Sequence, residues 1–247
     1  MPEPIASITG LKLRAGAEPF DIKLDPGKVV GLAGLEGHGQ GLFLEVLAGI
    51  SRATEGSISV DGKVLDRGFR DVGRAYDAGL AYVPRDRKDE GLFLQLPVLM
   101  NFGLPTLSRV SRGGVIQRRK LVQRYEEYAR DLGITAADEQ APIRILSGGN
   151  QQKVLLARWL AADPKILLLN DPSRGVDHGT KLSLQTIYRR VADRGSCVVL
   201  LSTEIEELLL TADETIVFRE FGVSRHLGAE EMTRQNILAA MFGAEVG

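Results

Sequence analysis

A dense group of glycines near the start of the chain has the spacing of a phosphate-binding loop. The segment reads Gly34-Leu35-Glu36-Gly37-His38-Gly39-Gln40-Gly41, between an apolar run over 29–33 and a helical pattern over 40–48. Glycines at this density let backbone N–H groups converge on one anion, and the start of a helix adds the positive end of its dipole. The spacing follows the frame G-x-x-x-x-G-K-[ST].

The last two positions of that frame depart from it. Gln40 stands where a lysine would contact the outer phosphates, and Gly41 stands where a serine or threonine would bind Mg²⁺. A plain turn between a strand and a helix explains the glycines equally well. We expect His38 to face solvent rather than a ligand.

A second segment combines a serine with two glycines at the expected start of a helix. It reads Leu146-Ser147-Gly148-Gly149-Asn150-Gln151-Gln152-Lys153. A serine hydroxyl and glycine N–H groups at a helix start form an anion site that faces outward. A simple helix cap by Ser147 is the alternative, but it leaves the paired glycines unexplained.

A third segment places polar side chains directly after a buried strand. The run Ile166-Leu167-Leu168-Leu169 ends in Asn170 and Asp171, and the chain continues as Pro172-Ser173-Arg174-Gly175-Val176-Asp177. A second apolar run, 197–201, ends in Ser202-Thr203-Glu204.

Short apolar runs alternate with helical patterns, which favours an α/β architecture with a largely parallel sheet. The expected strands lie near 5–13, 20–24, 29–33, 57–60, 80–83, 165–169, 197–201 and 215–218. The expected helices cover about 40–48, 118–132, 149–162, 180–193 and 229–242. No strand is expected over 92–142, so a helical subdomain of about 86–148 is predicted as an insertion in the α/β core.

Composition and charge exclude some classes of function. The 247 residues carry 31 Lys+Arg and 32 Asp+Glu, a net charge of −1, which argues against nucleic acid as a partner. The single cysteine, Cys197, lies in an apolar run, so we expect its thiol to be buried in a strand. No run reaches the ~18–20 apolar residues of a membrane span. We therefore expect a cytoplasmic protein.

Taken together, these segments resemble the ATP-binding cassettes of ABC transporters, and the resemblance covers nearly the whole chain. The Asn-Gln-Gln-Lys tail after Ser147-Gly148-Gly149, the segment Ser173-Arg174-Gly175-Val176-Asp177, and Tyr82-Val83-Pro84-Arg85-Asp86-Arg87-Lys88 are similar to the second cassette of bacterial sugar-type importers. The resemblance implies a P-loop NTPase core with an antiparallel β subdomain and an inserted helical subdomain. The whole of 1–247 would then be one nucleotide-binding domain.

The resemblance also assigns roles. Residues 34–41 would be the phosphate loop, and Leu146, Ser147, Gly148, Gly149, Asn150 and Gln151 would be the signature that covers the ATP of a partner cassette. Asn170 takes the Mg²⁺ position and Asp171 the catalytic carboxylate position, while Gly175, Val176 and Asp177 form the D-loop. Arg85 replaces the usual glutamine or glutamate of the Q-loop, and Glu204 replaces the switch histidine.

These departures gather around one phosphate and Mg²⁺ cluster, so the chain's own site is expected to be degenerate. No metal site of its own is predicted, and ATP and Mg²⁺ should bind weakly to the isolated chain. The signature matches the family pattern along its entire length, so it could complete the ATP site of a partner cassette that retains the missing groups. The expected role is an ATP-binding subunit, or half-subunit, of an importer for a sugar or related small solute, peripheral on the inner face of the membrane.

The expected partners are a second cassette, transmembrane permease subunits and a periplasmic or extracellular solute-binding protein. A coupling surface is expected at 85–105, although those apolar residues could merely pack the helical subdomain. Two other functions stay open: a regulatory or scaffolding pseudo-ATPase, and a working ATPase in which Arg85 replaces the missing lysine. The sequence leaves open whether the chain is a separate subunit or an excised C-terminal half.

Overall fold

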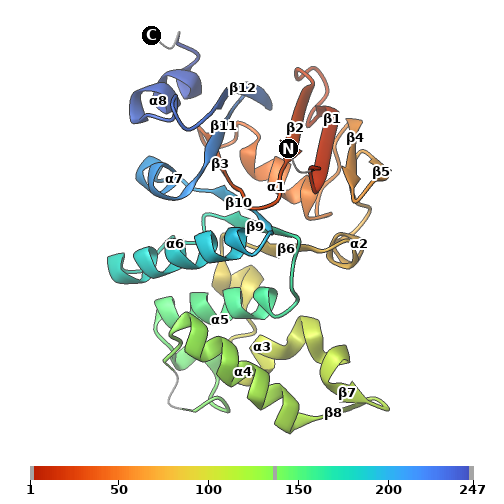
Figure 1. Ribbon diagram of the computed structural model, residues 1–247, viewed down its shortest axis with the longest axis vertical. Helices are drawn as coiled ribbons and strands as arrows, with labels where there is room; N and C mark the ends of the chain where they lie inside the picture. Colours follow the sequence, from red (N-terminus) through yellow and green to blue (C-terminus); the bar gives the residue numbers. More distant parts are fainter. Residues whose placement is uncertain (1–2, 136–137, 245–247) are drawn as a thin grey trace. The chain divides into compact units, whose positions relative to one another are not determined.

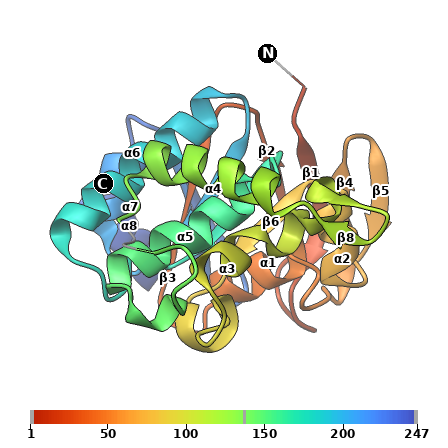
Figure 2. The same ribbon diagram turned by 90° about the horizontal axis from the view of Figure 1, so that it is seen from below.

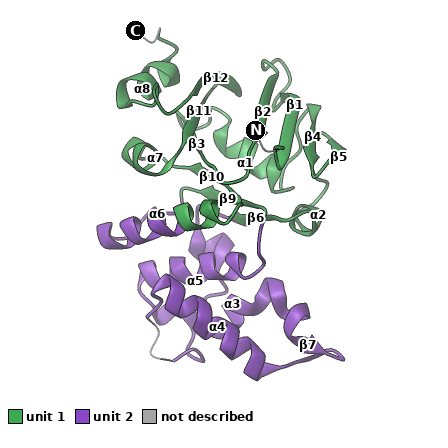
Figure 3. Ribbon diagram, in the orientation of Figure 1, with its two compact units in different colours: residues 1–82, 165–171, 188–247 green, residues 83–164, 172–187 purple. Residues whose placement is uncertain are grey.

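The computed structural model describes residues 3–135 and 138–244 (Figure 1). The chain forms two compact units, coloured separately in Figure 3. The first unit holds residues 1–82, 165–171 and 188–247, and the second holds 83–164 and 172–187. Two of the four boundaries fall inside β6 and α6, and each unit is built from segments distant in the sequence.

The first unit contains two sheets. The larger has the strand order β12-β11-β3-β10-β9-β6, in which β11, β3, β10 and β9 run parallel. Its strands are β3 (Val29–Gly34), β6 (Leu80–Val83), β9 (Ile166–Asn170), β10 (Cys197–Leu201), β11 (Glu214–Arg219) and β12 (Gly222–Leu227). The smaller sheet is antiparallel, in the order β2-β1-β4-β5. It consists of β1 (Ala6–Lys12), β2 (Phe20–Leu24), β4 (Glu55–Val60) and β5 (Lys63–Asp66).

Helix α1 (Gln40–Leu47) lies between the two sheets of this unit (Figure 1). Its Phe43 ring contacts Phe20 of β2 at a centroid distance of 5.8 Å and Phe218 of β11 at 5.4 Å. Such aromatic contacts add to the burial of apolar surface. Helices α7 (Ile205–Thr211) and α8 (Arg234–Phe242) contact the larger sheet through β3 and β11. The short helix α2 (Val72–Asp77) precedes β6.

The register of the larger sheet determines where the polar strand ends lie. Leu201, the last residue of β10, pairs with Leu32 of β3 on one side and with Asn170 of β9 on the other. The segments that follow these three parallel strands therefore leave the sheet at the same edge. In parallel α/β sheets, this carboxyl edge is where ligands bind.

The second unit is mainly helical. Helices α3 (Val98–Gly103), α4 (Arg118–Leu132) and α5 (Gly148–Leu160) contact one another and lie side by side in Figure 2. Shorter elements complete it: η1 (Arg87–Gly91), η2 (Leu104–Val110), η3 (Ile143–Ile145) and the hairpin β7 (Ser111–Arg112) with β8 (Val115–Ile116). Helix α6 (His178–Asp193) contributes residues to both units.

A buried arginine connects three segments of the second unit. Arg158 of α5 is 5% exposed, and its guanidinium donates to the backbone carbonyls of Asn101 and Gly91 and to Asn101 Oδ1. Desolvation lowers the pKa of Arg158 to about 10. Asn101 is fully buried and donates from Nδ2 to the carbonyls of Phe93, Leu96 and Pro97. The pair thereby fixes the segment between η1 and α3.

Most predicted elements are confirmed, including β10 and α4, whose observed bounds equal the predicted ones, and Cys197 is fully buried. One prediction is wrong: the stretch 92–142 does contain strands, the two-residue pair β7 and β8. Their pairing across Gly113-Gly114 is too short to leave an alternating pattern. The last helix begins at Arg234, later than expected. Within the described ranges, no helix has the length and apolarity that crossing a bilayer requires.

Candidate functional site

The glycine-rich loop joins β3 to α1 in a conformation that only glycine adopts readily. Gly37 and Gly39 have φ angles of 83° and 113°. A Cβ atom on Gly39 would lie 2.9 Å from the Cα atom of Phe221, so the backbones also approach too closely for a side chain. Gly39 is the N-cap of α1, and no side chain within 3–135 or 138–244 caps that helix start. The first amides of α1 are thus free of a competing side-chain acceptor, which suits an anion.

Gln40 is folded back onto the loop rather than extended from it. Its Nε2 atom donates to the carbonyl of Gly34 at 3.1 Å and to that of Leu35 at 2.9 Å. The side chain is 8% exposed, and its buried Oε1 atom has no hydrogen-bond partner among the described residues. The carboxamide therefore holds the loop closed on itself and brings no positive charge to it.

His38 contacts a neighbouring turn in addition to being partly exposed to solvent. Its side chain is partly buried, and its Nδ1 atom accepts a hydrogen bond from the Glu220 amide at 3.4 Å. Its carbonyl accepts from Phe221 N at 2.9 Å. His38 therefore attaches the loop to the β11–β12 turn.

Strand β9 ends in an amide side chain, Asn170, at the position to which the family resemblance assigns Mg²⁺ binding. Asn170 Nδ2 donates to the Tyr82 hydroxyl at 3.0 Å. The amide of Asn170 carries no negative charge, so it attracts a cation less strongly than a carboxylate would. Asn170 is therefore engaged with the neighbouring strand β6.

Asp171 is buried and held in an unusual backbone conformation. It is 3% exposed with φ at 48°, in the left-handed region. The Thr203 hydroxyl lies 3.2 Å from both carboxylate oxygens, and Thr203 N donates to Oδ1 at 3.4 Å. Its own amide donates to the Leu201 carbonyl at 2.8 Å. The carboxylate is thus directed at the loop after β10.

Glu204 is exposed at the start of α7. Its amide donates to the Ser202 hydroxyl at 3.1 Å, and Ser202 Oγ in turn donates to Glu207 Oε2 at 2.6 Å. The structure therefore brings the glycine-rich loop, Asn170, Asp171 and Glu204 to one sheet edge, as the register requires.

The groups at this edge fit a phosphate better than a divalent cation. The open helix start of α1 supplies amide donors for an anion. Gly41 has no side chain, and Asn170 offers a neutral amide oxygen in place of a carboxylate, so both suit Mg²⁺ less well than a serine hydroxyl and an aspartate would. Among the described residues, no group of three or more His, Cys, Asp or Glu side chains is arranged to hold a metal.

In the second unit, Ser147 is the N-cap of α5. Its Oγ atom accepts from Asn150 N at 3.3 Å and from Asn150 Nδ2 at 3.2 Å. Asn150 Oδ1 accepts from Thr135 N at 2.8 Å, and the buried Gln151 donates to the carbonyls of Ile143 and Leu146. The helix cap by Ser147 that was given as the alternative is therefore present in the structure. The asparagine and glutamine of this segment position the chain entering the helix.

Arg87 connects the signature segment to the D-loop within the second unit. Its Nη1 atom donates to the Arg174 carbonyl at 3.0 Å, and Nη2 lies 3.5 Å from the Gly175 carbonyl oxygen. A Cβ atom on Gly148 would lie 2.6 Å from Arg87 Nη2, so the missing side chain makes room for the guanidinium. The two motifs meet at this arginine.

Asp177 completes the D-loop by capping α6. The Thr180 hydroxyl donates to its carboxylate at 2.7 Å and the Thr180 amide at 3.0 Å, and these bonds lower the pKa of Asp177 below its ordinary value. A Cβ atom on Gly149 would lie 2.6 Å from Thr180 Oγ1. Thr180 is thus a second contact between the D-loop and the signature segment.

The segment predicted as a coupling surface is only partly exposed. Arg85 is partly buried, and Leu92, Val98 and Leu99 belong to the core of the unit. Phe93 is 58% exposed and Leu96 is 37% exposed. The alternative that these residues pack the helical unit is therefore correct for the three buried ones, whereas Phe93 and Leu96 are exposed to a partner.

Sequence reasoning missed the residues that act through long-range contacts. The motif over 82–88 contains Arg87 without assigning it a contact, and no motif points to Thr203, Arg158 or Asn101. Arginines in an otherwise apolar helix, such as Arg158 after Val154-Leu155-Leu156-Ala157, are the one signal that could have been used.

Comparisons with known proteins agree with this arrangement. The family model described as "ABC transporter" matches residues 17–174. The ribose import ATP-binding protein RbsA 1 of Rhizobium meliloti (strain 1021) is 34% identical over 243 residues, which are 98% of this chain and 48% of that protein. A putative ribose/galactose/methyl galactoside import ATP-binding protein 3 of Agrobacterium fabrum is 36% identical over 245 residues, again 98% of this chain and 48% of that protein. The chain thus spans about half the length of these relatives.

A solved structure shares the fold at lower identity. It is a dimeric post-hydrolysis state of an ATP-binding cassette bound to ADP and Pi, with a TM-score of 0.76 and 20% identity, covering 91% of this chain and 98% of that one. The likeness confirms the expected fold class.

Proposed function

The chain belongs to the ABC transporter family, and we propose that it is an ATP-binding subunit, or half of one, of an importer for a sugar such as ribose. In this proposal its own nucleotide site is degenerate, and its signature segment completes the ATP site of a second cassette. Permease subunits and a solute-binding protein would complete the importer, and the chain would act at the inner face of the membrane. The names of the relatives, which are ribose and galactose import proteins, support the solute class.

Gln40 is the observation that carries the proposal of a degenerate site. Its carboxamide donates to Gly34 and Leu35 and brings no positive charge to the phosphate loop. A hydrogen bond from a charged donor to a phosphate contributes about 1.5–3 kcal/mol to the binding free energy, and this loop lacks such a donor at position 40. With Asn170 bound to Tyr82 and Gly41 lacking a hydroxyl, ATP and Mg²⁺ should bind weakly and hydrolysis at this site should be nearly abolished.

The signature segment, in contrast, keeps every group that the role requires. Ser147 caps α5, and Gly148 and Gly149 place no side chain of their own over the helix start. Such a start attracts the terminal phosphate of a nucleotide held by another chain. The fold relative that is a dimer with ADP and Pi supports pairing of cassettes as the way to reach that phosphate.

The test compares Ser147→Arg with Gln40→Ala in the complex reconstituted with the second cassette and the permease. Ser147→Arg should fill the outward anion site and abolish most of the ATPase and transport activity, while the folding of this chain stays unchanged. Gln40→Ala should leave the turnover of the complex largely intact. Equal tolerance of both substitutions would contradict the proposal and favour a scaffolding pseudo-ATPase instead.

A further inference from the structure

A stretch of the second unit is strongly basic, although the chain as a whole is nearly neutral. Residues 91–125 contain no aspartate or glutamate. The same stretch contains six cations: Arg109, Arg112, Arg118, Arg119, Lys120 and Arg124. The whole chain has a net charge of −1, so this segment concentrates positive charge in one place.

Three of these cations are already engaged. Arg109 and Arg124 donate to the carbonyls of Ala161 and Ala162 after the end of α5, where cations complement the helix dipole. Arg118 Nη2 lies 4.0 Å from Glu139 Oε1. Arg112, Arg119 and Lys120 are exposed and form no ion pair with any residue of 3–135 or 138–244. Within the described residues, no ion pair therefore offsets these three charges.

The free cations lie within and just after an exposed hairpin in the sequence. Strands β7 and β8 pair as Ser111 with Ile116 and Arg112 with Val115, across a Gly113-Gly114 turn. Val115 is 70% exposed and Ile116 is 37% exposed. A Cβ atom added to either glycine of the turn would meet nothing within 4 Å. The turn of the hairpin therefore has no near neighbour among the described residues, and both aliphatic side chains are exposed, Val115 more than Ile116.

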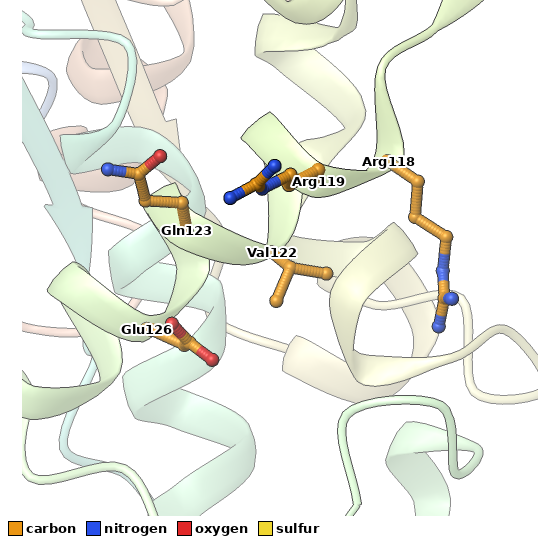
Figure 4. Close-up of a pocket in the computed structure, with 5 residues that line it drawn as sticks. All are labelled: Arg118, Arg119, Val122, Gln123 and Glu126. Atoms are coloured by element: carbon orange, nitrogen blue, oxygen red, sulfur yellow. The ribbon is translucent and has the colours of Figure 1, made fainter.

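The first turns of α4 extend this surface. Arg118 and Arg119 line a shallow pocket with Val122, Gln123 and Glu126, shown in Figure 4. Glu126 is the first acidic residue after the basic stretch and marks where the positive surface ends. We call the group formed by Arg112, Val115, Ile116, Arg118, Arg119 and Lys120 the basic hairpin surface.

We propose that the basic hairpin surface binds an anionic lipid bilayer. Aliphatic side chains enter the boundary between headgroups and acyl chains, while neighbouring cations attract the negative headgroups. Val115 and Ile116 supply the first property, and Arg112, Arg119 and Lys120 supply the second. A nucleic acid fits less well, because the tip holds no aromatic side chain on which a base could stack. This inference does not rest on the proposed transport function.

The test measures binding of the full chain to lipid vesicles by co-sedimentation. One set contains phosphatidylcholine alone, and the other also contains about 30% phosphatidylglycerol, a fraction chosen to give a strong negative surface. We expect binding only to the anionic vesicles. Raising the salt from about 0.1 M to 1 M shortens the electrostatic screening length from about 10 Å to about 3 Å. The higher salt should therefore release the protein from the vesicles.

Matched variants assign the binding to this surface. Each cation near an anionic membrane strengthens binding about fivefold, so Arg119→Gln with Lys120→Gln should weaken the partition coefficient about 25-fold. Val115→Ser should weaken it with little change in salt dependence. The control, Lys63→Gln with Arg70→Gln, removes two exposed charges elsewhere and should leave binding unchanged.

Absence of binding to anionic vesicles would overturn the proposal, and so would equal weakening by the control pair. Retention on an acidic polypeptide without binding to vesicles would also overturn it and would indicate an acidic protein partner. Nucleotide affinity, measured on the same variants, should not change. A failure of the transport proposal would therefore be distinguished from a failure of this one.

Discussion

The hydroxyl of Thr203 lies 3.2 Å from both carboxylate oxygens of Asp171, across the end of the parallel sheet. Asp171 follows β9 and Thr203 follows β10, and these strands are neighbours in register. The left-handed backbone of Asp171, with φ at 48°, directs its carboxylate toward this loop. A carboxylate that accepts these hydrogen bonds is a stabilising contact between two strand ends and a poor base for activating water.

The first prediction concerns Asp171. We expect the isolated chain to hydrolyse ATP at the background rate, and Asp171→Asn to leave that rate unchanged. Asparagine tolerates the left-handed conformation and can still bond Thr203, so this variant removes the charge with little strain. Phosphate release with purified protein is the measurement. A turnover of about 1 per second or more, lost in Asp171→Asn, would contradict the prediction.

The second prediction concerns Gln40. Gln40→Lys should bring a charged donor to the phosphate loop and raise ATP affinity roughly tenfold to hundredfold. Turnover should stay near background because Gly41, Asn170 and Glu204 still depart from a complete site, and groups that act as a unit are not restored singly. Calorimetric titration and phosphate release separate the two effects. Gln40→Met, of similar length without a charge, is the control and should not gain affinity.

The fold was predictable where one pattern spans a whole element. The apolar run of β10 and the helical period of α4 depend on burial alone, so their bounds follow from the sequence. The candidate site was predictable as a set of positions because parallel strand ends share an edge. The contacts between these positions were not predictable. Arg87 and Arg174 are 87 residues apart in the sequence, and Asp171, with φ at 48°, donates its amide to Leu201 of the neighbouring strand. The hairpin at Gly113-Gly114 was missed because two-residue strands carry no periodicity.

The third prediction concerns the buried Arg158. Arg158→Met keeps most of the side-chain volume but leaves the carbonyls of Gly91 and Asn101 without their donor. Each unsatisfied buried group costs about 1–3 kcal/mol, so we expect a loss of roughly 2–5 kcal/mol in the free energy of unfolding. Urea denaturation measures it. Arg119→Met, at an exposed position of α4, should change stability by about 0.5 kcal/mol or less.

The fourth prediction concerns pH. His226 Nε2 lies 3.0 Å from Glu214 Oε2 across β11 and β12, and this hydrogen bond raises the pKa of His226 above its ordinary value of 6.5. A raised pKa in the folded state stabilises the fold fully below the unfolded value, and this contribution disappears as the pH rises through the folded value. His226→Gln should therefore lower stability at pH 5.5 relative to the unchanged chain, and much less at pH 8. Urea denaturation at both pH values, with Glu214→Gln as the matched partner variant, is the measurement; a pH-independent difference would contradict the assignment.

The fifth prediction concerns Arg87 as a positioning residue. Its guanidinium donates to the Arg174 carbonyl at 3.0 Å and occupies the space beside Gly148, so it holds the D-loop against the start of the signature helix. If that helix start completes the site of a partner cassette, Arg87→Ala should displace it. A displacement of about 1 Å lowers catalysis as much as hundredfold, so we expect turnover of the assembled complex to fall roughly tenfold to hundredfold while KM for ATP changes little.

Two comparisons separate this role from a general loss of stability. Arg87→Lys keeps one donor and should retain part of the turnover, whereas Lys88→Ala changes the exposed neighbour and should retain all of it. The urea midpoint of Arg87→Ala should lie close to that of the unchanged chain, because the guanidinium bonds two carbonyls in a partly exposed loop rather than in the core. A fall in turnover that merely follows a fall in stability, or an equal fall in Lys88→Ala, would show that Arg87 does not position the signature segment.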